Sequence, residues 1–180
     1  MTKTVFFSVI GEDMNKYKLG LGFLLTTRGV PQLYYGTENL TKSFRNPSDA
    51  EVRKDFEGGW ADDKVNKFLA SGRTEKENEA FNFVKKLANY RKLSEVLTTG
   101  KLTQYLPTDG LYVYFRHTLD KTVMIIMSQS KEDKSLDTAR FMENMKGYVS
   151  AKNVMTDSVI TDLKTLKIPA NTFTILELQK

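Results

Sequence analysis

The sequence predicts an α+β fold in two parts, with a boundary near residue 97. Residues 1–97 hold helical patterns around one short apolar run and a long polar segment, which is typical of a piece of a parallel α/β fold. After Gly100 the pattern changes to short β segments separated by turn residues, with no helix between most of them. This change predicts an antiparallel β-sandwich over residues 98–180.

The first element expected is a buried helix over residues 13–28. Asp13 can cap its start, and Gly29 can end it in a left-handed conformation. The middle of the helix is apolar on every side and contains Gly20 and Gly22. Glycine destabilises a helix interior, so these two glycines indicate the close approach of another element.

A continuous apolar strand is expected next, in "VPQLYYG". Its apolar residues do not alternate with polar ones, and a strand covered on both faces has this pattern, as in a parallel sheet. A carboxylate, Glu38, follows two residues after the closing Gly36. A buried helix that runs directly into a buried strand is an α/β connection, and a single such unit cannot cover its own sheet.

Residues 37–73 are polar and irregular, and they contain the only tryptophan, Trp60. Loops of this length inside compact domains are usually functional or disordered. A short helix is expected inside the loop at residues 62–70, "DDKVNKFLA".

A clear helix is predicted over residues 75–92, and Thr74 and Glu77 form the capping box that opens it. A shorter helical turn, "SEVLTT", follows it. The apolar stripe of the long helix consists of Ala80, Phe83, Val84, Leu87 and Ala88.

Six β segments are predicted after Gly100, because turn residues divide this half of the chain. The turns are expected at residues 107–110, 119–121 and 169–171. The β segments are residues 101–107, 110–118, 122–130, 139–145, 151–157 and 171–179.

The composition excludes several classes of function. Lys and Arg outnumber Asp and Glu by 27 to 22, but the basic residues are scattered among acids, so no nucleic-acid partner is expected. The chain has no cysteine and a single histidine, His117, so neither a metal site nor a cofactor is expected. The N-terminus lacks a signal-peptide pattern, and no run approaches the roughly 20 apolar residues of a membrane span. We therefore expect a soluble protein with no membrane partner.

The stretch "RGVPQLYYGTE" resembles the motif Gly-x-Pro-x-x-Tyr-Tyr-Gly-x-Glu at the eighth barrel strand of the α-amylase superfamily of glycoside hydrolases. From about Phe6 to the C-terminus, the chain resembles the neopullulanase and cyclomaltodextrinase branch of that superfamily. The resemblance implies the last β/α unit of a (β/α)₈ barrel over residues 1–97, followed by the C-terminal β-sandwich of such enzymes. The segments that carry it are "YKLGLGFLLTTRGVPQLYYGTE", "AEVRKDFEGGW", "GRTEKENEAFNFVKKLANYRK", "LTTGKL" and "DGLYVYFR".

The resemblance also suggests where an α-glucan would be bound. The active site of such barrels lies at the C-terminal ends of the strands, so residues 37–73 would be the eighth βα loop, which lines the cleft. The aromatic residues would face sugar rings, and the charged ones would hydrogen-bond to hydroxyls. In the alternative interpretation the tyrosines belong to the barrel core and the glutamate only holds the loop. The expected substrate-binding residues are Tyr35, Glu38, Arg45 and Trp60.

No catalytic residue is expected in the chain itself. A retaining glycosidase needs two carboxylates at the scissile bond. The resemblance places the nucleophile and the acid/base upstream of residue 1. It places a third Asp, from an Asn-His-Asp motif, at the N-terminus, where Met1 and Thr2 stand in the His and Asp positions and Val5 replaces an Arg. The adjacent acids Asp62–Asp63 and Glu12–Asp13 are interpreted as caps and solvated charges.

One more pattern leaves two interpretations open. Tyr112, Tyr114 and Arg116 alternate along one face of a predicted strand. They would form either a sugar platform or a stripe that packs across strands.

Three hypotheses for function follow. The first is the C-terminal portion of an α-glucan hydrolase that acts on maltodextrin, cyclodextrin, pullulan or starch, inactive alone; its compartment, periplasm or cytoplasm, is left open. The second is a non-catalytic β-sandwich that binds carbohydrate or another protein. The third is assembly into a homo-oligomer, because the helix over 14–28 and the strand over 30–35 would expose apolar surface outside a barrel.

Overall fold

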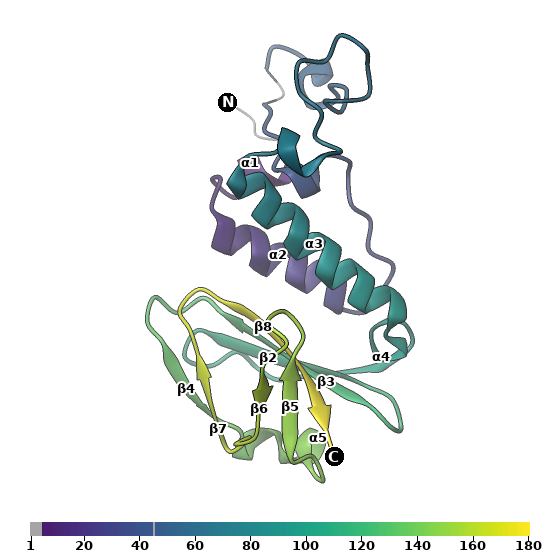
Figure 1. Cartoon of the computed structure of the whole chain (residues 1–180). Helices are drawn as coiled ribbons and strands as arrows, with labels where there is room; N and C mark the ends of the chain where they lie inside the picture. Colours follow the sequence, from purple (N-terminus) through teal and green to yellow (C-terminus); the bar gives the residue numbers. More distant parts are fainter. Residues whose placement is uncertain (1–4, 45) are drawn as a thin grey trace. The chain divides into compact units, whose positions relative to one another are not determined.

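The computed structural model describes residues 5–44 and 46–180 (Figure 1). The chain divides into two compact units. The first unit consists of Met1–Tyr17 and Pro31–Lys85, and the second of Lys18–Val30 and Lys86–Lys180. Helices α2 (Met14–Thr26) and α3 (Glu75–Leu93) each have residues in both units.

Helix α2 forms where the sequence predicts a helix, and a short helix, α1 (Phe6–Val9), precedes it. The cap is confirmed, because Asp13 Oδ1 accepts hydrogen bonds from the backbone N–H groups of Asn15 (2.8 Å) and Lys16 (3.1 Å). The close approach expected at Gly22 is also confirmed. A Cβ atom there would overlap the ring of Phe173 in strand β8 (Phe173–Gln179).

The strand predicted at residues 30–36 is wrong, because this stretch contains no strand. The side chains expected to be buried lie in solvent, with exposed fractions of 97% for Val30, 49% for Tyr34 and 45% for Tyr35. A β-strand needs a neighbouring strand that accepts and donates its backbone hydrogen bonds. No strand pairs with this stretch in the described part of the chain, so its apolar sequence alone does not produce one.

The loop over residues 37–73 contains the 3₁₀ turns η1 (Thr37–Asn39), η2 (Asp49–Val52) and η3 (Ala70–Gly72). The helix predicted at 62–70 is wrong. Asp63 Oδ2 accepts hydrogen bonds from the backbone N–H groups of Gly58 (2.6 Å) and Trp60 (3.0 Å), which holds a turn instead of a helix start.

Helix α3 confirms the predicted capping box. The backbone N–H of Thr74 donates to Glu77 Oε2 (2.8 Å), and the backbone N–H of Glu77 donates to Thr74 Oγ1 (3.2 Å). A short helix, α4 (Glu95–Thr98), follows it as expected. The apolar stripe is buried at Ala80, Phe83, Val84 and Leu87, and Ala88 is partly buried.

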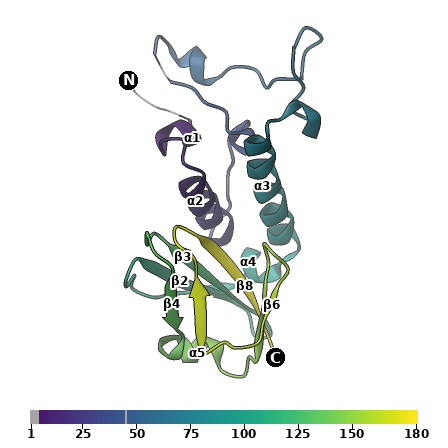
Figure 2. The same ribbon diagram turned by 60° about the vertical axis from the view of Figure 1, so that its left-hand side comes forward.

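The second unit contains two antiparallel sheets, which Figures 1 and 2 show from two directions. Six strands form the larger sheet in the order β1-β2-β3-β8-β5-β6, and β4 pairs with β7 in the smaller one. Besides β8, the strands are β1 (Lys101–Gln104), β2 (Leu111–His117), β3 (Thr122–Ser128), β4 (Lys134–Asp137), β5 (Ser150–Asn153), β6 (Val159–Ile160) and β7 (Thr165–Ile168). The predicted β-sandwich is confirmed.

The strand predicted at 139–145 is wrong, since this segment forms the 3₁₀ turn η4 (Ala139–Phe141) and the helix α5 (Met142–Met145). Phe141 and Met145, four residues apart, are both buried, and this is a helical spacing. Strands β4, β6 and β7 were not predicted. All three are short: β6 has only two residues, and β4 and β7 have four residues each, with polar residues among them.

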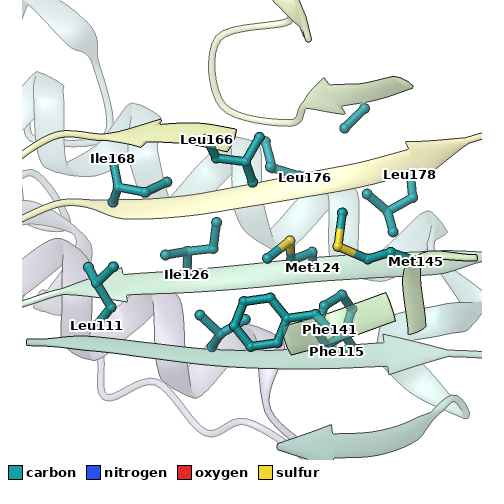
Figure 3. Close-up of a cluster of buried hydrophobic side chains, with 12 residues drawn as sticks. Leu111, Phe115, Met124, Ile126, Phe141, Met145, Leu166, Ile168, Leu176 and Leu178 are labelled. Atoms are coloured by element: carbon teal, nitrogen blue, oxygen red, sulfur yellow. The ribbon is translucent and has the colours of Figure 1, made fainter. Parts of the chain in front are cut away.

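The sandwich core lies between the two sheets (Figure 3). Phe115 and Met124 come from the larger sheet, Leu166 and Ile168 from β7, and Phe141 closes one side. The other face of the larger sheet is also covered within this unit, by residues of α2 and α3. The Thr26 hydroxyl lies 2.6 Å from the Tyr114 hydroxyl, and Tyr90 donates to Glu177 Oε2 (2.7 Å). Burial on both faces explains why β3 is a continuous apolar run.

Two buried arginines hold the C-terminal end of α2. Arg91 donates to the carbonyl oxygens of Leu25 (2.9 Å) and Gly29 (2.6 Å). Arg116, which is 0% exposed, donates to the carbonyl oxygens of Thr26 (3.0 Å), Thr27 (2.8 Å) and Gly100 (2.9 Å). Burial lowers the pKa of both guanidinium groups. Both side chains remain charged, because arginine does not deprotonate in proteins, and cations stabilise the C-terminal end of a helix.

We predict that Arg116→Met destabilises the protein by about 3 kcal/mol, because three buried carbonyl groups lose a charged donor. Urea unfolding monitored by circular dichroism measures the change. The matched control is Arg140→Met, since Arg140 is exposed and should cost no more than about 0.5 kcal/mol. Equal losses in the two variants would contradict the role assigned to Arg116.

We also predict a low pKa for Asp157, about 2 instead of the ordinary 3.8. Its carboxylate is paired with Lys152 Nζ (2.8 Å) and with Lys86 Nζ. The folded-state pKa is depressed, so the stabilisation is complete above about pH 4 and is lost as the pH falls towards 2. Carboxyl-carbon NMR titration measures this pKa. Lys152→Met should raise it towards 3.8, whereas Lys131→Met should leave it unchanged; an Asp157 that titrates near 3.8 in the unmodified protein would refute the prediction.

Candidate functional site

The structure places Tyr35 at the end of the exposed extended stretch, with its ring packed at a tilt against that of Tyr34. The two ring centroids are 4.4 Å apart. The Tyr35 hydroxyl donates to the carbonyl oxygen of Lys54 (3.0 Å), and the hydrogen bond with Tyr34 raises the pKa of Tyr35. The pair therefore holds the loop by its hydroxyl groups and leaves about half of each ring in solvent.

Glu38 lies in the turn η1, directly after Gly36, whose φ is +79°. A Cβ at Gly36 would overlap the hydroxyl of Thr41, so this turn requires glycine. The buried Tyr17 donates its hydroxyl to the carbonyl oxygen of Thr37 (3.0 Å). Burial raises the pKa of Tyr17, and the charge of Glu38 raises it further. Glu38 is partly buried on a turn that is anchored from both sides.

Trp60 lies at the tip of a turn in the loop, and its side chain is 63% exposed. The Asp63 carboxylate holds this turn. The backbone N–H groups of Trp60 and Gly58, which donate hydrogen bonds to it, lower its pKa. Lys67 Nζ pairs with Glu57 (2.7 Å) and Glu77 (2.7 Å), which ties the loop to the start of α3. An exposed tryptophan on an anchored turn is available to a ligand.

The structure does not bring the expected substrate-binding residues together. No hydrogen bond, ion pair or ring contact joins Tyr35, Glu38 and Trp60 to one another in the part of the chain that is described. Arg45 lies outside the described residues, as do Met1 and Thr2.

The face of β2 with Tyr112, Tyr114 and Arg116 is a packing stripe. Tyr114 and Arg116 are both 0% exposed, so neither can meet a sugar. The ring of Tyr112 lies 5.2 Å from that of Tyr114. His117 Nε2 lies 3.1 Å from Thr103 Oγ1 on the neighbouring strand β1. The interpretation as a sugar platform is therefore wrong.

The sandwich carries a cavity of about 320 Å³ that sequence analysis missed. Its walls come from residues that follow β1, from β4 and from η4. Neither β4 nor the helical turn at 139–141 was predicted, so these side chains could not be placed together. An aromatic residue beside Pro107, Tyr105, was the available signal.

No three His, Asp or Glu side chains within residues 5–44 and 46–180 gather closely enough to hold a metal ion. No helix among them is sufficiently long and apolar to cross a bilayer.

Comparison with known proteins supplies the context. Residues 102–177 match the family model of the cyclo-malto-dextrinase C-terminal domain. A cyclomaltodextrin glucanotransferase of Geobacillus stearothermophilus is 26% identical over 75% of this chain, and a maltogenic alpha-amylase of Bacillus acidopullulyticus is 29% identical over 93% of it. These alignments cover 16% and 26% of the two relatives, so the chain spans about a sixth to a quarter of their length.

Solved structures share the fold. The alpha-amylase of Geobacillus thermoleovorans, solved with acarbose, aligns with a TM-score of 0.70 and 18% identity, covering 96% of this chain and 35% of the amylase. An Anoxybacillus alpha-amylase aligns with a TM-score of 0.71 and 20% identity, covering 98% of this chain and 36% of that one. The chain thus resembles the C-terminal portion of an α-amylase superfamily glycoside hydrolase, and its residues 102–177 are similar to the C-terminal domain of cyclo-malto-dextrinases.

Proposed function

We propose that the chain is the C-terminal part of an α-glucan hydrolase, which cleaves α-1,4 linkages in maltodextrin, cyclodextrin, pullulan or starch when complete. In this proposal residues 1–97 close a (β/α)₈ barrel and line part of its cleft, and residues 98–180 form the β-sandwich domain beside it. The chain by itself does not hydrolyse glycosidic bonds.

The stretch over residues 30–35 is the observation that carries the proposal. It is apolar and has no strand partner among residues 5–44 and 46–180, and Val30 is 97% exposed. A strand of a parallel barrel is covered on both faces and bonded at both edges. The sequence suits that environment and not the one in which it lies, so neighbouring barrel strands would supply what it lacks.

The chemistry of the carboxylates supports the absence of catalysis. A general acid at neutral pH needs a raised pKa. In the described part of the chain, hydrogen bonds or ion pairs lower the pKa of four carboxyl groups: Asp13, Asp63, Glu77 and Asp157. Asp13 and Asp63 accept backbone hydrogen bonds as caps, which favours the ionised form.

We assign substrate contacts to the loop in the complete enzyme. Tyr35 and Trp60 have exposed aromatic side chains on anchored backbone, and Glu38 lies within the turn η1. With Arg45, these residues would line the sugar cleft at the C-terminal end of the eighth strand.

The same proposal predicts that the isolated chain associates with other copies of itself. An exposed apolar surface favours contacts between copies. In the first unit, the exposed large apolar side chains include Leu33, Tyr34, Tyr35, Trp60, Val65, Phe68 and Leu69.

The decisive test reads the coding strand upstream of the Met1 codon and assays the purified chain on maltodextrin, β-cyclodextrin and pullulan. We expect an open frame that encodes an Asp nucleophile, a Glu acid/base and an Asn-His-Asp motif, and no release of reducing sugar by the chain alone. A stop codon and ribosome-binding site directly upstream would refute the proposal in favour of an independent module. Release of reducing sugar would refute the claim of inactivity.

We predict that Tyr35→Ala, Glu38→Gln and Trp60→Ala each lower kcat/KM at least tenfold in the complete enzyme, which corresponds to about 1.4 kcal/mol of transition-state binding. Val65→Ala is the control, since Val65 lies in the same loop and is 40% exposed. Steady-state kinetics on maltoheptaose measures the effect. If none of the three variants differs from the control, the residues only hold the loop.

A further inference from the structure

The cavity of the sandwich is a formed pocket at the side of the domain. It measures about 320 Å³, near the lower end of the range for small-ligand sites, which is about 300–1,000 Å³. Strand β4, which forms one wall, is paired only with β7. Its lining includes Tyr105, Thr108, Asp109, Lys134, Asp137 and Arg140.

Tyr105 presents an aromatic ring in a fixed orientation. Its ring packs edge-on against Phe141, with centroids 4.8 Å apart, and against Phe115, with centroids 5.9 Å apart. Figure 3 shows these two phenylalanines in the core. The Tyr105 hydroxyl lies 2.7 Å from Glu143 Oε1 and 2.9 Å from Asn144 Oδ1. The ring is therefore pre-organised, and a ligand would lose little by ordering it.

Arg140 supplies positioned donors beside this ring. Its guanidinium donates to Thr108 Oγ1 (2.8 Å) and to the carbonyl oxygen of Leu106 (3.1 Å). It lies 5.9 Å from the centroid of the Tyr105 ring. A guanidinium has five N–H donors in a planar fork, so donors remain for a ligand.

The charges of the lining select against ions. Lys134 and Arg140 give two positive charges, and Asp109 and Asp137 give two negative ones, so the sum is zero. None of the four takes part in an ion pair among the residues that the structure describes. The pocket therefore offers separate donors and acceptors around an aromatic floor. A neutral polyhydroxylated ring, which has an apolar C–H face and hydroxyl groups at its edge, matches this pattern.

A second concave region, bounded by Glu95, Lys101, His117 and Asp120, is wider, about 590 Å³. No aromatic ring other than the His117 imidazole faces it, and its most apolar wall is the fully exposed Leu119. Its lining therefore lacks a platform on which a sugar ring could stack.

We propose that the Tyr105–Arg140 pocket binds a short segment of α-glucan on the β-sandwich. The sugar stacks its C–H face on Tyr105, Arg140 and Lys134 donate to its hydroxyl groups, and Asp109 and Asp137 accept from them. The choice of α-glucan among neutral sugars rests on the proposed function, whereas the pocket itself does not.

The test is a titration of the whole chain, labelled with ¹⁵N, with maltotetraose. We expect saturable shifts in the backbone amides of Leu106, Thr108, Ser135 and Leu136. Cellotetraose should bind at least tenfold more weakly, and inorganic phosphate should give no saturable shift in these amides. Tyr105→Ala should weaken maltotetraose binding at least tenfold, and Arg140→Met at least threefold.

Tyr148→Ala is the matched control. Tyr148 packs on the sandwich core, as Tyr105 does. Its hydroxyl group is hydrogen-bonded to Thr122 Oγ1 (2.9 Å), and its side chain does not line the pocket. Its removal should change the affinity less than twofold. If Tyr105→Ala does not fold, Arg140→Met decides, because residue 140 is exposed.

Several outcomes would contradict the proposal that this pocket binds α-glucan. These are no saturable shift with maltotetraose, shifts confined to other residues, an unchanged affinity in Arg140→Met, or equal binding of cellotetraose or phosphate. The proposed function is judged separately by the upstream coding sequence. An open frame with no binding at the pocket leaves the enzyme proposal standing, and binding without an open frame leaves only the pocket.

Discussion

The second unit depends on two buried cations that have carbonyl oxygens instead of carboxylates as partners. Arg91 and Arg116 meet at the C-terminal end of α2, where backbone carbonyl groups lack helical donors. Through these contacts one helix end, α3, β2 and the backbone of Gly100 are held at one point. The cost of burying two positive charges is offset by the helix dipole and by charged hydrogen bonds. Because these arginine contacts hold α2 and α3 against the larger sheet, both faces of the sheet are covered, and its central strands can be apolar throughout.

The apolar stretch over residues 30–35, in contrast, is not covered by other elements in this way. There the chain has exposed apolar side chains, and no strand pairs with it among the described residues. The flanking elements are nevertheless well formed: α2 precedes the stretch and the turn after Gly36 follows it. This contrast between the covered sandwich and the uncovered apolar stretch supports our proposal that the chain is part of a larger enzyme. It also explains why the aromatic residues of the loop are anchored but not gathered into one site.

The pocket of the sandwich follows from the inequality of the two sheets. A six-stranded sheet faces a two-stranded one, so the smaller sheet cannot cover all of the larger. The helical turn at 139–141 fills part of the difference with Phe141, and Tyr105 closes the core beside it. The remaining space is lined by the aromatic residues Tyr105 and Phe141 and by charged side chains, and this lining is the basis of our proposal that it binds a sugar.

The sequence by itself determined the features that depend on neighbours within a few residues. Asp13 and the Thr74–Glu77 capping box determined where two helices begin. The turns near Gly110 and Asn171 separated strands, and the glycine at position 22 indicated the close approach of another element. Tertiary structure decided what depends on distant partners. The apolar run at 30–35 needed strands to pair with, and residues 139–145 became helical because Phe141 and Met145 both had to reach the core. Strands β4 and β7 exist only as each other's partners, so their sequences carry little signal and the pocket they help to form could be seen only in the folded chain. An apolar pattern shows that a segment can be buried. Whether the segment forms a strand, forms a helix or stays exposed depends on which other elements are available to pack against it.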